Sequence, residues 1–197
     1  MITALLMAAV VAASPYPGPR RHPARAGAPV AAVDQTLSDA EVRARVENDL
    51  SSIDVPITDR QWQALGPRAV PALQATLQDS SALPSRRAAA VAGLAAIGGA
   101  QARRSVLEAA EDEGQPSAVR TRAVRSAARF LSAQELSGRL TPLLRDPVHP
   151  AVRAAAAEVL ARSAPRSACG AIRALAEREG PARGTFARAL ERCGAAP

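Results

Sequence analysis

The sequence predicts an all-α fold, an α-solenoid of about four helical hairpins behind an N-terminal capping helical segment. The aromatic content of 2% leaves few residues suited to strands. Alanine-rich segments of helical length alternate instead with breaks at Gly, Pro and Asp. The helical pattern also repeats about every 33 residues. Helix pairs that recur at such a period must stack, because one pair cannot bury its apolar face alone.

The first 33 residues are expected to precede the folded domain. Residues 1–13 form an apolar run that is too short to span a bilayer and has the length of a secretory signal peptide. Cleavage is expected after residue 13 or as late as residue 26. The run lacks the usual basic start, so an ordinary N-terminal helix stays an alternative. Residues 14–33 contain five prolines and are predicted to be a linker.

Residues 34–66 are predicted to form an N-terminal helical cap on the array. Ser38 with Glu41, and Thr58 with Gln61, have the spacing of capping boxes, in which each side chain bonds the other residue's backbone N–H. The first box predicts a helix that runs to about Leu50, and the second predicts a short helix that contains a tryptophan.

The repeat array is expected over residues 67–197. We predict four helical hairpins from the breaks between apolar segments. Their helix pairs are expected at 67–79 with 84–97, 100–112 with 116–131, 133–145 with 149–163, and 166–179 with 182–193.

Two polar positions follow the repeat. The arginines Arg87, Arg120 and Arg153 begin successive second helices, and the aspartates Asp79, Asp112 and Asp146 lie in the turns before them. In the helical wheel Arg120 lies at the margin of a buried face that contains Val119, Ala123, Ala127 and Phe130. We expect Arg153 to interact with Asp146 across the turn of its hairpin.

At these residues the chain resembles the HEAT repeat family, including its short bacterial type. The similar segments are AVPALQATLQDSS and RLTPLLRDPVHPAVRAAAAEVLA, and the resemblance covers about residues 60–193. It implies a solenoid in which the three aspartates and three arginines form a structural ladder between neighbouring repeats. The last hairpin departs from the pattern, with Glu179 and Arg183 in place of the pair, as an atypical terminal repeat would.

The sequence contains no recognisable catalytic or metal-binding constellation. His22 in the linker and His149 in a turn have no second ligand at metal-binding spacing. The acidic run of Glu111, Asp112 and Glu113 belongs to a turn that also contains glycine and proline, which favours a solvated turn over an acid–base pair. We therefore predict a protein that is not an enzyme and binds no cofactor or metal.

The formal net charge is +7, and all 25 basic residues are arginine. The absence of lysine indicates a compositional preference of the genome more than selection for nucleic acid. Stacking on nucleic acid requires accessible aromatics, whereas Phe130 and Phe186 lie at apolar wheel positions. We predict an exported scaffold for protein–protein interaction, periplasmic or secreted, with no transmembrane span in the mature chain. The alternative is an intracellular nucleic-acid or polyanion binder that uses an arginine-rich helix face.

A partner-binding surface is predicted along the second helices. Shifts by the repeat period relate Arg129 to Arg162 and Arg192, and relate Arg125 to Glu158 and Arg188. Because adjacent helices pack about 8–10 Å apart, Arg129, Arg162 and Arg192 are expected to form a ridge, and Arg125 and Arg188 are further candidate partner-binding residues. Our hypothesis is that the ridge docks an acidic protein surface, and the alternative is a solvated basic face.

Cys169 and Cys193 are the two cysteines of the chain, and helix geometry predicts a disulfide between them. They lie at similar distances before and after the turn near Gly180, at the open end of the last hairpin. Both also share the apolar phase of their helices. In a cytoplasmic chain the alternative is a pair of buried free thiols.

Overall fold

Every regular element in the described part of the chain is helical. A computed structural model describes residues 37–52, 57–146, 148–179 and 184–195, and none of these lies in a strand. The predicted signal peptide (1–13), its alternative cleavage site, the whole linker (14–33) with His22, and cap residues 34–36 lie outside the described residues. The all-α prediction is confirmed for the part of the chain that the structure describes.

The N-terminal segment begins with two helices that start at the predicted capping boxes. Helix α1 (Asp39–Ser51) begins after Ser38, and α2 (Asp59–Leu65) begins after Thr58. In each box the hydroxyl accepts the N–H of the residue three positions on, and that residue's side chain accepts the cap N–H. A 3₁₀ turn, η1 (Gly66–Ala69), leads from α2 into the helices that follow.

The remaining helices agree with the predicted pairs to within a few residues. They are α3 (Val70–Gln78), α4 (Pro84–Ile97), α5 (Gly99–Glu111), α6 (Ser117–Ala127), α7 (Ala133–Leu140), the 3₁₀ turn η2 (Pro142–Arg145), α8 (Pro150–Ser163), α9 (Pro165–Glu179) and α10 (Ala187–Ala195). The expected helix 133–145 is divided because Pro142 has no N–H to continue α-helical bonding. Helix α6 ends four residues earlier than predicted, at Ala127, and the N–H groups of Arg129 and Phe130 then bond the carbonyls three residues before them.

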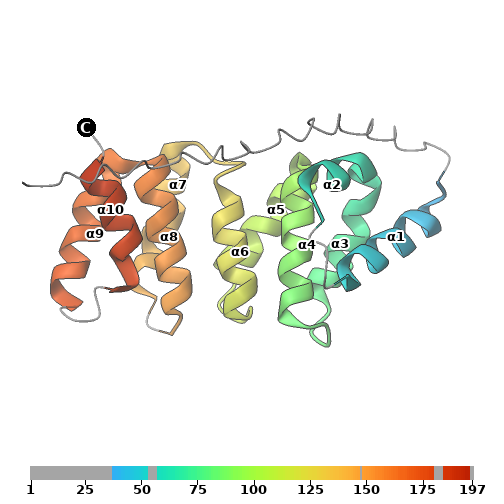
Figure 1. The fold of residues 1–197 in the computed structure, drawn as a ribbon, viewed down its shortest axis with the longest axis horizontal. Helices are drawn as coiled ribbons and strands as arrows, with labels where there is room; N and C mark the ends of the chain where they lie inside the picture. The colour runs from blue at the N-terminus through green and yellow to red at the C-terminus, as the bar shows by residue number, and fades with distance from the viewer. Residues whose placement is uncertain (1–36, 53–56, 147, 180–183, 196–197) are drawn as a thin grey trace, which may run out of the picture. The chain divides into compact units, whose positions relative to one another are not determined.

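The helices contact one another in a serial order (Figure 1). Consecutive helices pack as the pairs α3–α4, α5–α6, α7–α8 and α9–α10. The second helices of these pairs also contact each other in sequence, α4 with α6, α6 with α8 and α8 with α10, while α2 packs on the free side of α4. We call α4, α6, α8 and α10 the second helices, and α3, α5, α7 and α9 the first helices.

Alanine allows the second helices to approach each other closely. Ala123 and Ala127 of α6 and Ala155 of α8 are fully buried, as the wheel predicted for α6. Phe130, which the wheel placed on the same face, is partly buried because it lies beyond the end of α6. At Gly93 of α4 an added Cβ would lie 3.0 Å from a methyl group of Leu73, so a larger residue there would require the Leu73 side chain to shift.

Candidate functional site

The three turn aspartates organise the turns in which they lie. In each of them Oδ1 accepts the backbone N–H of the residue two positions later, as in an Asx turn. These bonds join Ser81 to Asp79, Gly114 to Asp112 and Val148 to Asp146, each at 2.9 Å. The turn therefore fixes the carboxylate, and in Asp112 and Asp146 the second oxygen, Oδ2, accepts a side-chain hydrogen bond.

Each of the three periodic arginines hydrogen-bonds a backbone carbonyl at the C-terminal end of the first helix of its own pair. Each Nε donates to the carbonyl of the residue two positions before the turn aspartate: Arg87 to Leu77 at 2.9 Å, Arg120 to Ala110 at 3.5 Å, and Arg153 to Leu144 at 2.9 Å. Such carbonyls have no partner within their helix. The guanidinium is thereby oriented so that its terminal nitrogens extend toward the next helix pair.

The best-buried of these contacts joins Arg120 to Asp146. Nη1 of Arg120 lies 2.7 Å from Oδ2 of Asp146, and the side chains are 1% and 8% exposed. The helical wheel placed Arg120 at the margin of the buried face, and in the structure its guanidinium is enclosed there against the following turn. An ion pair removed from water in this way is costly to break from one side.

Arg87 is connected to Asp112 through the side-chain amide of Gln115. Nη2 of Arg87 donates to Oε1 of Gln115 at 2.6 Å, and Nε2 of Gln115 donates to Oδ2 of Asp112 at 2.9 Å. Sequence reasoning missed Gln115, although its place three residues after Asp112 in the same turn was a usable signal. Asp79 receives no arginine among the described residues and bonds Ser81 instead, so it is not a member of the ladder that the resemblance implied.

The third arginine pairs with Glu179 at the end of α9. Its guanidinium carbon also lies 5.1 Å from the ring centroid of Phe186. The expected pairing of Arg153 with Asp146 is wrong, because each arginine extends to the next pair and Asp146 receives Arg120. Glu179 thus accepts the last arginine, while Arg183 lies outside the described residues. We call Arg87, Arg120 and Arg153 with their acceptors the arginine ladder.

The environment of the ladder lowers the pKa of two of its aspartates. Burial raises the pKa of Asp146, but the N–H groups of Val148 and His149, together with Arg120, outweigh it and the net shift is downward. The side chain of Gln115 lowers the pKa of Asp112 most, followed by the N–H of Gly114. Both carboxylates are therefore charged at neutral pH, as the arginine contacts require.

The predicted partner-binding residues form two rows along the second helices, and the first row contains both signs of charge. Arg125 of α6 and Arg188 of α10 lie on either side of Glu158 of α8, with N–O distances of 3.7 and 3.8 Å. We call Arg125, Glu158 and Arg188 the mixed row. Its central glutamate partly neutralises two of the predicted binding arginines.

The second row lies one helical turn further on and consists of Arg129, Arg162 and Arg192, which we call the arginine row. All three are exposed. Nη2 of Arg129 lies 2.5 Å from Oδ2 of Asp59 in α2, an ion pair that the repeat period did not indicate. Within the described chain, Arg162 and Arg192 form no ion pair.

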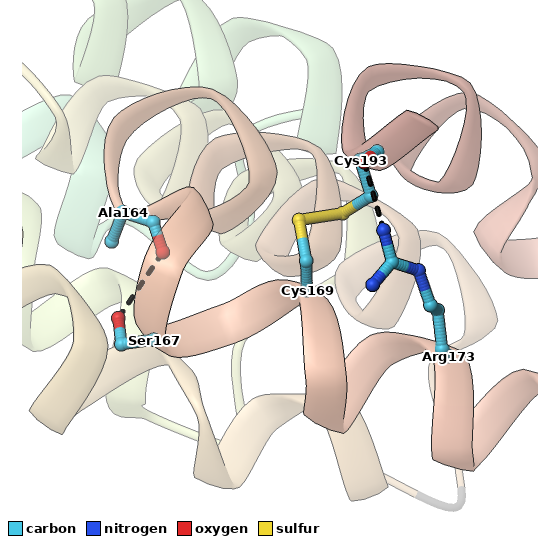
Figure 2. Close-up of a disulfide and its surroundings, with 5 residues drawn as sticks. All are labelled: Ala164, Ser167, Cys169, Arg173 and Cys193. Atoms are coloured by element: carbon cyan, nitrogen blue, oxygen red, sulfur yellow. Dashed lines mark hydrogen bonds between the residues drawn. A yellow bond between two sulfur atoms is a disulfide. The ribbon is translucent and has the colours of Figure 1, made fainter. Parts of the chain in front are cut away.

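The predicted disulfide is confirmed. Sγ of Cys169 and Sγ of Cys193 are bonded at 1.98 Å, joining α9 to α10 (Figure 2). Both cysteines are buried, and Nη2 of Arg173 donates to the carbonyl of Cys193 at 2.9 Å. The bond restrains the terminal helix pair, which has a neighbouring pair on one side only within the described chain. Disulfides of this kind form in oxidising environments.

Of the acidic and histidine residues considered for chemistry, Asp112, Glu113 and His149 lie in turns, Glu111 ends α5, and His22 lies outside the described residues. Among the described residues no group of three or more His, Cys, Asp or Glu could hold a metal ion. Nδ1 of His149 lies 3.6 Å from Asp146, too far for a hydrogen bond. Glu111 pairs with Arg139 at 2.5 Å, whereas Asp112 belongs to the ladder.

Comparisons with known proteins add no family to these observations. No protein-family model, curated protein or solved structure matches this chain. Within the described residues, none of the helices combines the length and the apolar character needed to cross a membrane.

Proposed function

We propose that this chain is an α-solenoid of HEAT-like hairpins that acts, outside the cytoplasm, as a scaffold for a protein with an acidic surface. The solenoid is supported by the order of helix contacts, in which each second helix packs on the next. It is also supported by the arginine ladder, which recurs with the repeat and links each pair to its successor. The proposal includes no catalytic step.

The observation that supports binding best is that two arginines of the arginine row have no acidic partner in the described part of the chain. The mixed row contains its own carboxylate, whereas Arg162 and Arg192 have no acidic partner among the described residues. Both arginines are exposed on adjacent helices that contact each other. An acidic partner surface would supply the missing counter-charge and would be attracted over a distance of about a Debye length.

The disulfide supports a location outside the cytoplasm. Two cysteines that are joined in the terminal pair would be kept reduced in most cytosols. An N-terminal apolar run with the length of a signal peptide agrees with this location. A fusion of residues 1–33 to a reporter that is active only after export tests the location, and an inactive reporter would contradict it.

The binding proposal is tested with a double charge reversal, Arg162→Glu with Arg192→Glu. The immobilised full chain is exposed to envelope proteins of the source cells at low salt, and the retained proteins are identified by mass spectrometry. We expect the wild type to retain at least one acidic protein that the reversed variant loses, and retention to weaken as salt increases.

The matched control reverses two exposed arginines of the first helices, Arg104→Glu with Arg166→Glu. This variant has the same net charge as the test variant and should retain the partner. Equal retention by all three proteins would contradict a role for the arginine row. In another outcome the wild type retains a random DNA duplex that the reversed variant loses, while both retain the same proteins. That result would favour the polyanion-binding alternative.

A further inference from the structure

A pocket lies between α1, α3 and the turn that leads into α4, away from the second-helix rows. Its volume is about 540 Å³, within the range of small-ligand sites. Ala72 and Ala75 of α3 form part of a floor without long side chains. No side chain of the arginine ladder or of the disulfide lines this pocket.

Each side of the pocket presents one cation and one anion. Arg43 and Glu47 lie one turn apart on α1, and Asp79 and Arg86 lie on the turn and on α4. Among the described residues no salt bridge joins either arginine to either carboxylate. The hydroxyl of Ser81, above all, lowers the pKa of Asp79, so this carboxylate is charged at neutral pH.

Arg86 has an unmet hydrogen-bonding requirement in this pocket. Its Nε is buried and has no hydrogen-bond partner, whereas Nε of the adjacent Arg87 donates to a backbone carbonyl. Buried donors of a charged group are rarely left without an acceptor. Because Nε itself has almost no accessible surface, a carboxylate in the pocket would meet the Nη nitrogens of Arg86 and would reach Nε only after the side chain rotates.

We propose that this pocket binds a short peptide with free termini. Arg43 and Arg86 would hold its carboxylate, Glu47 and Asp79 would hold its ammonium group, and small side chains would lie over the alanine floor. A ligand with charge of one sign would be repelled by two of the four side chains. A zwitterion satisfies both pairs at once.

The test uses trialanine as the probe and the full chain, followed by isothermal titration calorimetry and by NMR shifts of the α1 and α3 amides. We expect saturable binding with shifts at Ala72 and Ala75. N-acetyl-trialanine removes the ammonium group and trialanine amide removes the carboxylate. Each should bind at least about tenfold more weakly, the effect of losing a charged hydrogen bond. Absence of saturable binding, or equal binding of the blocked peptides, would overturn the proposal.

Three variants locate the site. Arg43→Gln changes an exposed residue of α1, and Arg86→Gln changes the buried donor; each should weaken trialanine binding about tenfold or more. The control Arg104→Gln changes an exposed arginine elsewhere and should bind as the wild type does. Circular dichroism establishes that each variant is folded. If Arg86→Gln fails to fold, Arg43→Gln decides, and its unchanged affinity would overturn the proposed site.

Discussion

The arginine ladder and the arginine row both repeat an arginine at about the same period along the array, yet in opposite environments. Arg120 of the ladder is 1% exposed and contacts both a backbone carbonyl and a carboxylate. Arg129 of the row is 47% exposed and meets a carboxylate that is itself exposed. Periodicity therefore identifies repeated positions, but burial decides which of them hold the fold together.

The difference has an electrostatic origin. Water screens charges on the surface, so an exposed pair contributes little to stability. A buried pair has lost its hydration, and removal of one partner leaves the other charge without compensation. The ladder is thus expected to determine stability, while the row is available for contact with another molecule.

The largest effect is expected from Arg120→Ala, which should lower the free energy of unfolding by about 3–5 kcal/mol. The substitution leaves the enclosed carboxylate of Asp146 without its counter-charge. Urea denaturation followed by circular dichroism measures the loss. Arg122→Ala, an exposed position on the same helix, is the control and should change stability by less than about 0.5 kcal/mol. Equal urea midpoints for Arg120→Ala and Arg122→Ala would show that a ladder arginine is no more important for stability than an exposed one.

The same contact predicts a pH dependence. Asp146→Asn should cost about 3 kcal/mol at pH 7, because Arg120 stays buried without a carboxylate. The folded-state pKa of Asp146 lies below its unfolded value of about 3.9. The stability that the charged Asp146 carboxylate contributes is therefore complete above its unfolded-state pKa, and it is lost as pH falls through its folded-state pKa. Denaturation between pH 7 and pH 2 should show the difference between variant and wild type decreasing only below about pH 4. A constant difference would contradict this assignment.

The disulfide gives the terminal pair a restraint that internal pairs do not have. Replacement of both Cys169 and Cys193 by alanine should lower stability by about 3 kcal/mol in the chain-entropy description. Thermal denaturation measures the loss, and reduction of the wild type should reproduce it. Alkylation of exported protein before and after reduction, followed by intact-mass measurement, provides an independent check. Two thiols that react without a reductant would show that the bond does not form.

Arg153→Ala should have an intermediate effect, a loss of about 1–3 kcal/mol. Arg153 is more exposed than Arg120 but bonds a carbonyl and Glu179 and lies over Phe186. Urea midpoints of Arg153→Ala and Arg120→Ala, measured under the same conditions, rank the two ladder positions. A loss for Arg153→Ala that exceeds the loss for Arg120→Ala would mean that burial is not the decisive factor.

The smallest effect on stability is expected from the arginine row. The double reversal Arg162→Glu with Arg192→Glu should change the free energy of unfolding by less than about 0.5 kcal/mol, since both side chains are exposed and unpaired within the described chain. Chemical denaturation measures this value on the protein used for partner retention. A loss comparable with that of Arg153→Ala would show that the row belongs to the scaffold.

Local sequence patterns predicted the helices well, because the determinants of a helix end lie within a few residues of it. The capping boxes at Ser38 and Thr58 are formed, and the break expected between the helices 84–97 and 100–112 lies at Gly98. The break at Pro142 was readable in principle from its missing N–H but was not predicted. The disulfide also followed from helix phase, since one hairpin fixes both cysteines relative to a single turn.

By itself, then, the sequence determined the helices, their period and the pairing of the cysteines. Tertiary structure decided the partners of the arginines. Arg120 bonds Asp146 rather than Asp112, Gln115 connects Arg87 to Asp112, and Asp59 of α2 reaches Arg129. The physical reason is reach: a guanidinium at the end of a long side chain crosses from one helix pair to the next. Its acceptor therefore depends on how the pairs stack, and this stacking includes contacts between second helices that are not adjacent in the sequence.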